Sequence, residues 1–176
     1  MTTYAILLRA VNVGGNNLVA MPRLRAALTA DGFTNVQTYV QSGNVIVESR
    51  ANSSKLEHRV AKIIHDEFGI DVAMVVRTAA QLRATVTGNP FAGRDEKQLY
   101  VMFLASAPSP AAIARIDTRR SPGDEVLVRG HDLYLHLTNG AARTKFSVAY
   151  LEKCLGTSGT MRNWNTTNRV TLLAGG

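Results

Sequence analysis

Three polar stretches of the chain carry residues whose types and spacing suit the binding of an anion. The first, Arg9–Asn17, contains two adjacent glycines that let the backbone turn its amides toward one point, as in an anion-binding nest. The second is Gln41–Asn44. In the third, Thr160–Asn168, an arginine, several carboxamides and a helix start could hold a phosphate, a carboxylate or a base edge. The candidate ligand-binding residues are Arg9, Asn12, Gly14, Gly15, Asn17, Ser42, Asn44, Arg162, Asn163 and Asn165.

Each stretch also has a purely structural interpretation. The asparagines of the first loop can satisfy backbone groups in a tight strand-to-helix turn, and Gln41–Asn44 can be only a hairpin turn. In the third stretch, Asn165 and the two threonines after it can cap the last helix, while Trp164 can fill a gap between two halves of the chain. Both interpretations stay open for all three stretches.

Several kinds of chemistry are disfavoured. The first loop matches neither the Rossmann nor the P-loop spacing. His58 and His65 lie seven residues apart on a helix whose apolar face is complete without them, and His131 and His136 flank a hairpin with no clustered carboxylates. No metal and no cofactor are therefore predicted. Cys154 is the only cysteine, which excludes an intrachain disulfide. None of the three stretches contains Asp, Glu, His or Lys, so a general base is not evident and the sequence leaves open whether the protein is an enzyme.

Composition favours a globular protein with anionic partners. Of 176 residues, 45% are hydrophobic, which is enough for a core. The formal net charge of +7 attracts nucleic acid, nucleotides or acidic lipids. The Lys and Arg residues are spread along the chain, without the run that marks a nucleic-acid tail. The first residues form no signal peptide and no stretch is long enough to span a membrane, so we expect a cytoplasmic protein that does not enter membranes.

The elements that must position these stretches follow from hydrophobic periodicity and turn residues. A helix begins at Met21-Pro22, and Ser54 with Glu57 forms a capping-box pattern at the start of another. Further helices are expected over Ala79–Val86, from Ser109, around Val148 and from about Asn165. The expected strands are Tyr4–Arg9, Val36–Val40, Asn44–Glu48, Val72–Arg77, Leu99–Ala105, Glu125–Arg129 and Leu133–Leu137, with a short extended stretch at Thr160–Arg162.

The element order β-α-β-β-α-β occurs twice, at an offset of roughly 90 residues. The predicted fold is therefore α+β, with duplicated ferredoxin-like (βαββαβ) halves whose antiparallel sheets carry helices packed on one face. We expect domain 1-90 and domain 96-176 to be fused and to share an interface, with the joint in Gly88–Lys97. We also expect the Gln41–Asn44 turn at the opposite end of the first sheet from the Arg9–Asn17 loop, and the Arg162–Asn168 stretch beside that loop.

Five motifs occur in one order over nearly the whole chain. They are Arg9-x-Val-Asn-Val-Gly-Gly-x-Asn17, Gln41-Ser-Gly-Asn-Val45, Asn89-Pro-Phe91, Leu133-Tyr-Leu-His-Leu137 with Asn139-Gly140, and Arg162-Asn-Trp-Asn-Thr166. Together they resemble the bacterial domain-of-unknown-function family number 1697. The resemblance implies a cytoplasmic α+β protein of two ferredoxin-like halves, without an established activity. Ala10 stands where that family usually has Gly, and Asn16 where it often has Lys, which removes a charge that a phosphate would use.

Two classes of function follow. The first is a binding module that holds a phosphate-bearing or other anionic ligand, or weakly and non-specifically a nucleic-acid backbone. The alternative is an enzyme on a small anionic substrate, with Arg9 and Arg162 as electrostatic stabilisers. Base recognition by an RNA-recognition-type sheet is disfavoured, because Asn44–Glu48 has no aromatic residue and Leu133–Leu137 offers only Tyr134. The oligomeric state is unknown from the sequence.

Overall fold

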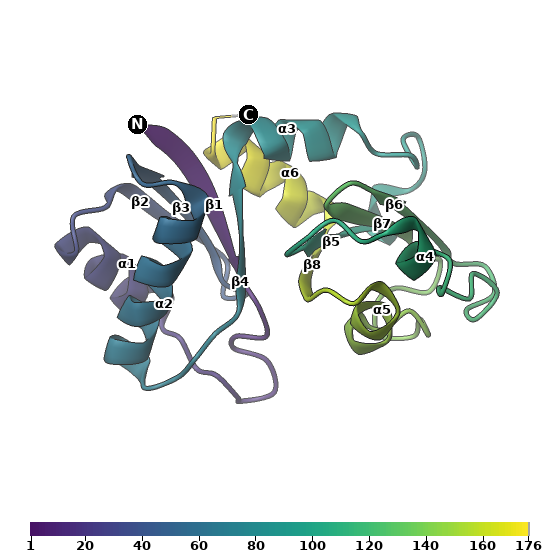
Figure 1. The fold of residues 1–176 in the computed structure, drawn as a ribbon, viewed down its shortest axis with the longest axis horizontal. Helices are drawn as coiled ribbons and strands as arrows, with labels where there is room; N and C mark the ends of the chain where they lie inside the picture. The colour runs from purple at the N-terminus through teal and green to yellow at the C-terminus, as the bar shows by residue number, and fades with distance from the viewer. Residues whose placement is uncertain (176) are drawn as a thin grey trace. The chain divides into compact units, whose positions relative to one another are not determined.

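The computed structural model describes residues 1–175, which form an α+β protein of two compact units. One unit comprises Met1–Arg83 and the C-terminal residues from Val170 on, and the other comprises Ala84–Arg169. The described residues form two four-stranded antiparallel sheets and six α-helices (Figure 1). The domain boundaries expected from the sequence, 1-90 and 96-176, stay a prediction.

The first unit holds one sheet, with the strand order β2-β3-β1-β4 and antiparallel pairing throughout. Its elements are β1 (Thr2–Leu8), α1 (Met21–Ala30), β2 (Thr34–Tyr39), β3 (Asn44–Ser49), α2 (Ser53–Phe68), β4 (Met74–Thr78) and the start of α3 (Ala79–Thr87). Helices α1 and α2 lie side by side on one face of this sheet (Figure 1).

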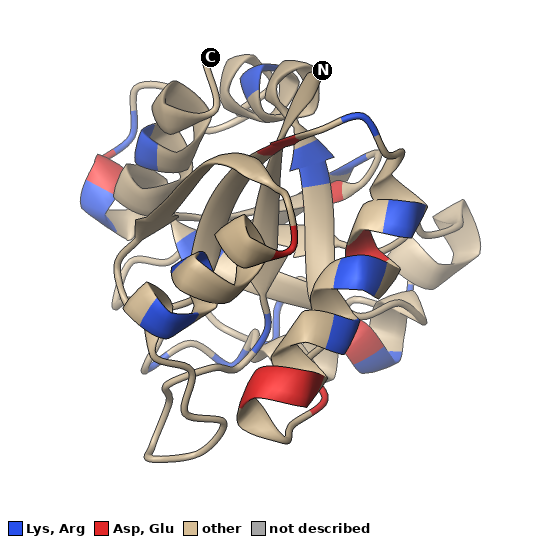
Figure 2. Ribbon diagram, turned by 90° about the vertical axis from the view of Figure 1, so that its left-hand side faces the viewer, with Lys and Arg blue, Asp and Glu red and all other residues tan. Residues whose placement is uncertain are grey.

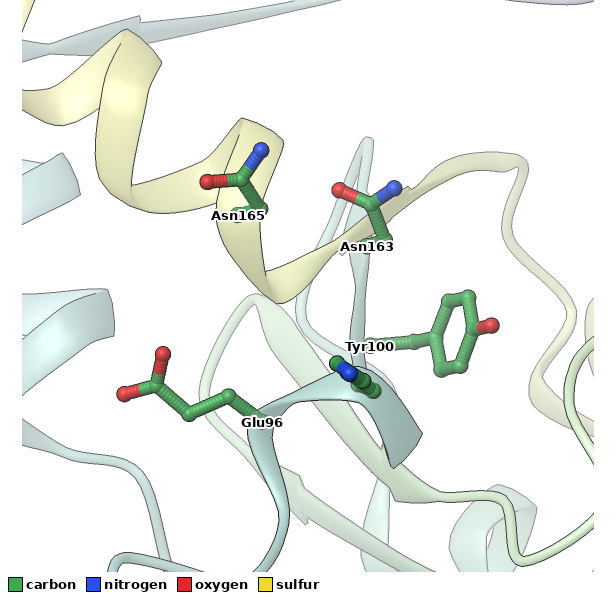
Figure 3. A pocket seen from close by; sticks show the side chains of 5 residues that line it. Glu96, Tyr100, Asn163 and Asn165 are labelled. Carbon is green, nitrogen blue, oxygen red and sulfur yellow. The ribbon is translucent and has the colours of Figure 1, made fainter.

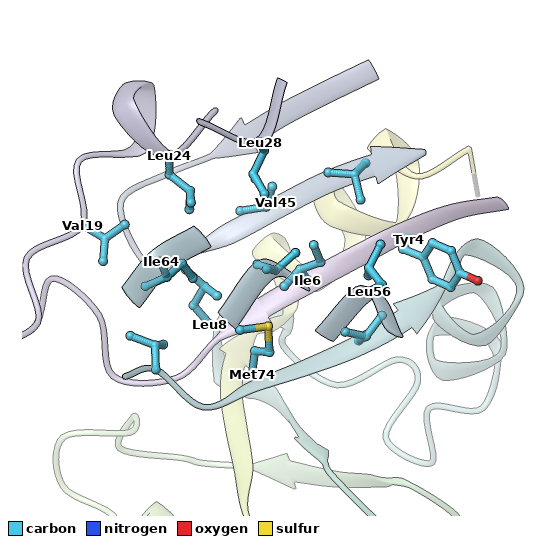
Figure 4. Packing of buried hydrophobic residues seen from close by; sticks show 14 of the residues in the cluster. Tyr4, Ile6, Leu8, Val19, Leu24, Leu28, Val45, Leu56, Ile64 and Met74 are labelled. Carbon is cyan, nitrogen blue, oxygen red and sulfur yellow. The ribbon is translucent and has the colours of Figure 1, made fainter. Parts of the chain in front are cut away.

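Alternation along β1 builds the first core. Tyr4, Ile6 and Leu8 point to the helix-covered face, where they pack against Leu24 of α1 and Ile64 of α2 (Figure 4). Each of these five side chains is at most 6% exposed. The residues between them on β1 are buried as well, so both faces of this central strand are shielded from solvent.

Helix α2 starts two residues earlier than the capping-box pattern predicted. The side-chain oxygen of Asn52 accepts a hydrogen bond from the backbone N–H of Lys55 at 2.9 Å and so caps the helix that begins at Ser53. The prediction of Ser54 as the cap was wrong, because Asn is at least as good an N-cap as Ser and lies two residues upstream. At the other end Gly69 takes the left-handed conformation with φ 67° and ends the helix.

The second unit repeats the strand order as β6-β7-β5-β8. Its elements are the 3₁₀ helix η1 (Glu96–Gln98), β5 (Leu99–Leu104), α4 (Pro110–Ile113), β6 (Glu125–Arg129), β7 (Asp132–His136), α5 (Val148–Leu155), β8 (Gly159–Asn163) and the first part of α6 (Trp164–Leu173). Met102 and Leu104 of β5 pack with Leu151 and Leu155 of α5 in a second core.

Two sequence expectations for this unit are corrected. Helix α4 spans a single turn and ends at Ile113, whereas the sequence suggested a helix that also carries Ile116. Residue Ile116 follows in a turn and still packs in the second core. The last helix begins at Trp164, one residue before the expected start, because the side-chain oxygen of Asn163 accepts a hydrogen bond from the N–H of Thr166 at 2.8 Å.

The equal strand order places residues of the two sheets in equivalent register positions. Tyr4 of β1 lies opposite Thr78 of β4, and Tyr100 of β5 lies opposite Asn163 of β8. Thr78 and Asn163 each immediately precede a helix, and each side-chain oxygen accepts a hydrogen bond from the backbone three residues ahead. The two sheets thus end their outer strands in the same way.

Charged residues are distributed over helices, strands and loops, with Lys and Arg interspersed among Asp and Glu (Figure 2). Two ion pairs connect α1 and the residue after its C-terminal end to α2. Arg23 lies 3.2 Å from Glu67, and Arg59 lies 2.5 Å from Asp31. Among residues 1–175, the helices are all too short or too polar to cross a membrane.

Candidate functional site

The first glycine loop is a small hairpin. Val13 and Asn16 form a β-bridge, and the N–H of Asn16 donates to the carbonyl oxygen of Val13 at 3.1 Å. Between them Gly14 and Gly15 have φ values of 59° and 78°, and two consecutive positive values are typical of a type I′ turn. An anion-binding nest instead alternates right- and left-handed residues, so the loop has a different geometry from the one expected.

Asn12 joins this hairpin to the Gln41–Asn44 turn. Its side-chain nitrogen donates to the carbonyl oxygens of Gln41 at 2.7 Å and Val19 at 2.9 Å, and its side-chain oxygen accepts from the N–H of Val19 at 2.8 Å. The prediction that loop and turn lie at opposite ends of the sheet was therefore wrong. The physical reason is that β3 is the antiparallel neighbour of β1, so its first residue, Asn44, pairs with Leu7 near the end of β1.

The polar side chains of this region are used to hold the backbone. The side-chain nitrogen of Asn17 donates to the carbonyl oxygen of Ala10, and that of fully buried Asn44 donates to Tyr39 and to the hydroxyl of Ser42. These carboxamides and this hydroxyl therefore stabilise the loop, in line with the structural interpretation of the sequence.

Arg162 is separated from the other candidates of its stretch. The side chain is 7% exposed, and its Nη1 donates to the hydroxyl of Thr160 at 2.6 Å and to the carbonyl oxygen of Met161 at 2.9 Å. Burial lowers the pKa of Arg162 to about 10. Because side chains alternate along β8, Arg162 and Asn163 point to opposite faces. A site that Arg162 shares with Gly14 and Gly15, which belong to the other unit, stays a prediction.

A cavity in the second unit brings together two further candidates, Asn163 and Asn165. It has a volume of about 470 Å³ and is lined by Glu96, Lys97, Tyr100, Asn163 and Asn165. Figure 3 shows the carboxamides of Asn163 and Asn165 on one side of this space, with Glu96 and Tyr100 on the other. The cavity combines one cation, one carboxylate, one phenol and two carboxamides within a volume typical of small-molecule sites.

The functional groups in this cavity are available to a ligand. The side chains of Glu96, Lys97, Tyr100 and Asn165 make no hydrogen bond or ion pair with any residue that the structure describes. Asn163 uses its side-chain oxygen to cap α6, while its side-chain nitrogen makes no hydrogen bond with the described residues. This differs from the first loop, whose carboxamides are engaged with the backbone.

Tyr4, at the equivalent position of the other sheet, shows how the cavity arises. The Tyr4 hydroxyl donates to the carbonyl oxygen of Ala51 at 2.9 Å, and the side chain is 6% exposed. Tyr100 is only half-buried, and its hydroxyl has no such acceptor among the described residues. The same register position is therefore closed in one sheet and open to a cavity in the other.

A hydrogen-bonded chain fixes η1, which carries Glu96 and Lys97. Asp95 caps it by accepting from the N–H of Lys97 at 3.0 Å. The side-chain nitrogen of Gln98 donates to the carbonyl oxygen of Thr138 at 3.2 Å, so its side-chain oxygen faces Nε2 of buried His136 at 2.9 Å. That nitrogen must then carry the proton and donate. The two charged residues therefore sit on a short helix anchored on both sides.

Sequence reasoning missed three residues of this cavity. Glu96 and Lys97 lie in Gly88–Lys97, which its glycines, proline and charges marked only as a joint. Tyr100 is the second residue of an apolar strand, so the sequence pattern indicates a core residue. A signal was present, since Asp95 before a short charged segment is a helix-capping pattern. No group of three or more His, Cys, Asp or Glu residues among residues 1–175 is arranged to hold a metal.

Comparisons with known proteins give a family and a fold. A family model described as "Protein of unknown function (DUF1697)" matches residues 1–134, which include η1 and β5 but end before Asn163. A solved structure, that of conserved bacterial protein SP0830 from Streptococcus pneumoniae, resembles the chain with a TM-score of 0.78 and 21% identity over 98% of both chains. At this identity the likeness concerns the fold alone. None of the curated proteins compared with the chain matches it.

Proposed function

We propose that this chain, which belongs to the DUF1697 family of proteins of unknown function, is a binding module for a phosphate-bearing or other anionic small molecule. The observation that carries the proposal is the cavity of about 470 Å³, where the side chains of Glu96, Lys97, Tyr100 and Asn165 make no hydrogen bond with the described residues. Lys97 supplies the positive charge and the side-chain nitrogen of Asn163 supplies a hydrogen-bond donor for the anionic oxygens, while Asn165 lines the same cavity.

The first loop plays a supporting part in this proposal. We propose Arg9, Gly14 and Gly15 as further contacts of an anion, whereas the carboxamides around them hold the loop together. Lys and Arg are spread over the fold, so any binding of nucleic acid would depend on its phosphate backbone. Such binding would be weak and steeply dependent on salt. The buried single cysteine, Cys154, is consistent with a cytoplasmic location, which is part of the proposal.

A second candidate function is an enzyme on a small anionic substrate. One observation favours it: the Glu96 carboxylate lines the same cavity as Lys97 and could act as a general base beside a bound anion. Under this alternative the Glu96→Gln variant would bind the substrate and fail to turn it over. Under the binding proposal, neither the parent protein nor the Glu96→Gln variant turns over the bound ligand.

We also infer that the two sheets are a duplicated ferredoxin-like arrangement, with one helix after the first strand and one after the third strand of each. The equal strand orders and the matched ends of β4 and β8 support this inference. In this view one of the two duplicated sheets acquired the cavity at the register position of Tyr100. The equivalent position in the other sheet, that of Tyr4, stayed closed.

Calorimetric titration with ribose 5-phosphate tests the function. The Lys97→Gln variant should bind this probe about tenfold or more weakly, because a charged hydrogen bond contributes about 1.5–3 kcal/mol. Lys153→Gln is the matched control, since it removes the same charge from an exposed position in the last turn of α5. Absence of binding at millimolar probe, or equal affinities in the two variants, would refute the proposal.

A further inference from the structure

The cavity lining is more specific than an anion site requires. A bare anion needs cations and donors, yet the carboxylate of Glu96 and the ring of Tyr100 lie in the same cavity. Glu96 and Lys97 are consecutive residues of a 3₁₀ helix, so their side chains leave the axis about 120° apart. The two charges can therefore contact separate parts of one ligand: an anionic group at Lys97 and a hydrogen-bond donor at Glu96.

Each remaining group has a counterpart in one class of compound. A carboxylate can accept hydrogen bonds from the hydroxyls of a ribose. An aromatic side chain such as Tyr100 gives a surface on which a base stacks. A compact ammonium such as that of Lys97 binds a phosphate as a point charge. A phosphate, a ribose and a flat base occur together in a nucleotide.

Asn165 selects among the bases. Its carboxamide carries a donor and an acceptor that make no hydrogen bond with the described residues. Adenine offers an acceptor at N7 beside a donor at N6 and so matches both, whereas guanine presents two acceptors, N7 and O6, on that edge. Asn165 sits in the first turn of α6, so regular secondary structure holds its backbone.

The geometry points to an adenine mononucleotide, adenosine monophosphate, as the ligand. Lys97 holds the phosphate and Glu96 accepts from the ribose hydroxyls, while the base stacks on Tyr100 and its N6–N7 edge binds Asn165. This inference rests on the proposed anion-binding function of the same cavity. A single aromatic side chain provides one stacking surface, so the ligand is a free mononucleotide rather than a run of bases in single-stranded RNA.

Calorimetric titrations with AMP, GMP and ribose 5-phosphate test the inference. We expect AMP to bind about 5- to 150-fold more tightly than ribose 5-phosphate, the range that stacking of one base provides. We also expect AMP to bind about tenfold more tightly than GMP. Tyr100→Leu should abolish the first difference and Asn165→Ala the second, while both variants keep the affinity for ribose 5-phosphate, which shows that they are folded.

The possible outcomes separate this inference from the function on which it rests. Equal affinities for AMP and ribose 5-phosphate would overturn base recognition and leave the anion site intact. Tighter binding of a single-stranded oligoadenylate than of AMP would overturn the free mononucleotide. Failure of all phosphorylated probes to bind would overturn both proposals.

Discussion

Tyr100 and Asn163 lie directly opposite each other on β5 and β8, and both side chains line the same cavity. Their counterparts in the other sheet are Tyr4 and Thr78, where the tyrosine hydroxyl is bound to the carbonyl oxygen of Ala51. Replacing each tyrosine with phenylalanine should therefore change the free energy of unfolding by different amounts.

We predict that Tyr4→Phe lowers the free energy of unfolding by about 1 kcal/mol, because a buried hydrogen bond is lost. Tyr100→Phe should change it by less than about 0.5 kcal/mol, since its hydroxyl makes no hydrogen bond with the described residues. Unfolding in urea measures both values. A larger loss for Tyr100→Phe than for Tyr4→Phe would mean that the Tyr100 hydroxyl has a structural role that contradicts this account.

Gly43 is required by its surroundings as well as by its backbone. It has φ 82°, and a Cβ atom there would lie 2.6 Å from Cγ2 of Val11 and 2.7 Å from Cβ of Leu8. Gly43→Ala should destabilise the protein by about 2–5 kcal/mol, the sum of a strained conformation and overpacking. Gly14→Ala is the control: it has φ 59° but open space around it, so the cost should be about 1–2 kcal/mol. Similar melting temperatures for the two variants would argue against the close packing at Gly43.

Asn12 is predicted to be a structural residue of the first loop. Asn12→Ala should cost about 2 kcal/mol, because three hydrogen bonds to Val19 and Gln41 are lost. Asn16→Ala, at the exposed tip of the same loop, should cost less than about 0.5 kcal/mol. Thermal unfolding of both variants checks the difference. An unchanged melting temperature for Asn12→Ala combined with lost ligand binding would instead make Asn12 a binding residue.

The order of the elements could be predicted from the sequence, because periodicity, glycines and caps are local signals. The family predicted from five motifs is confirmed as well. The meeting of Asn12 with Gln41 was missed, because it depends on β3 running antiparallel to β1. Asn163 and Asn165 were predicted as binding residues, and both line the cavity. Tyr100 was missed because its pairing with Asn163 joins residues far apart in the chain.

Asp124 should make stability depend on pH in the acid range. Burial alone would raise the pKa of this carboxyl, but hydrogen bonds from Ser121, Thr144 and Thr138 outweigh it and hold the pKa below its ordinary value. A lowered folded-state pKa contributes stability that is complete above the unfolded value of about 3.9 and is lost as pH falls through the folded pKa. Asp124→Asn should therefore be less stable than the parent at pH 7, and the difference should shrink below about pH 4. Urea unfolding from pH 7 to pH 3 tests this, and a constant difference over that range would contradict it.

The central claim, that an anionic ligand occupies the cavity of the second unit, is tested most directly by the backbone amide NMR spectrum of the labelled protein. The spectrum is recorded during titration with ribose 5-phosphate. The account predicts saturable shifts concentrated in Glu96–Tyr100 and Asn163–Asn165. Shifts concentrated in Arg9–Asn17, or no saturable shifts at millimolar probe, would contradict it.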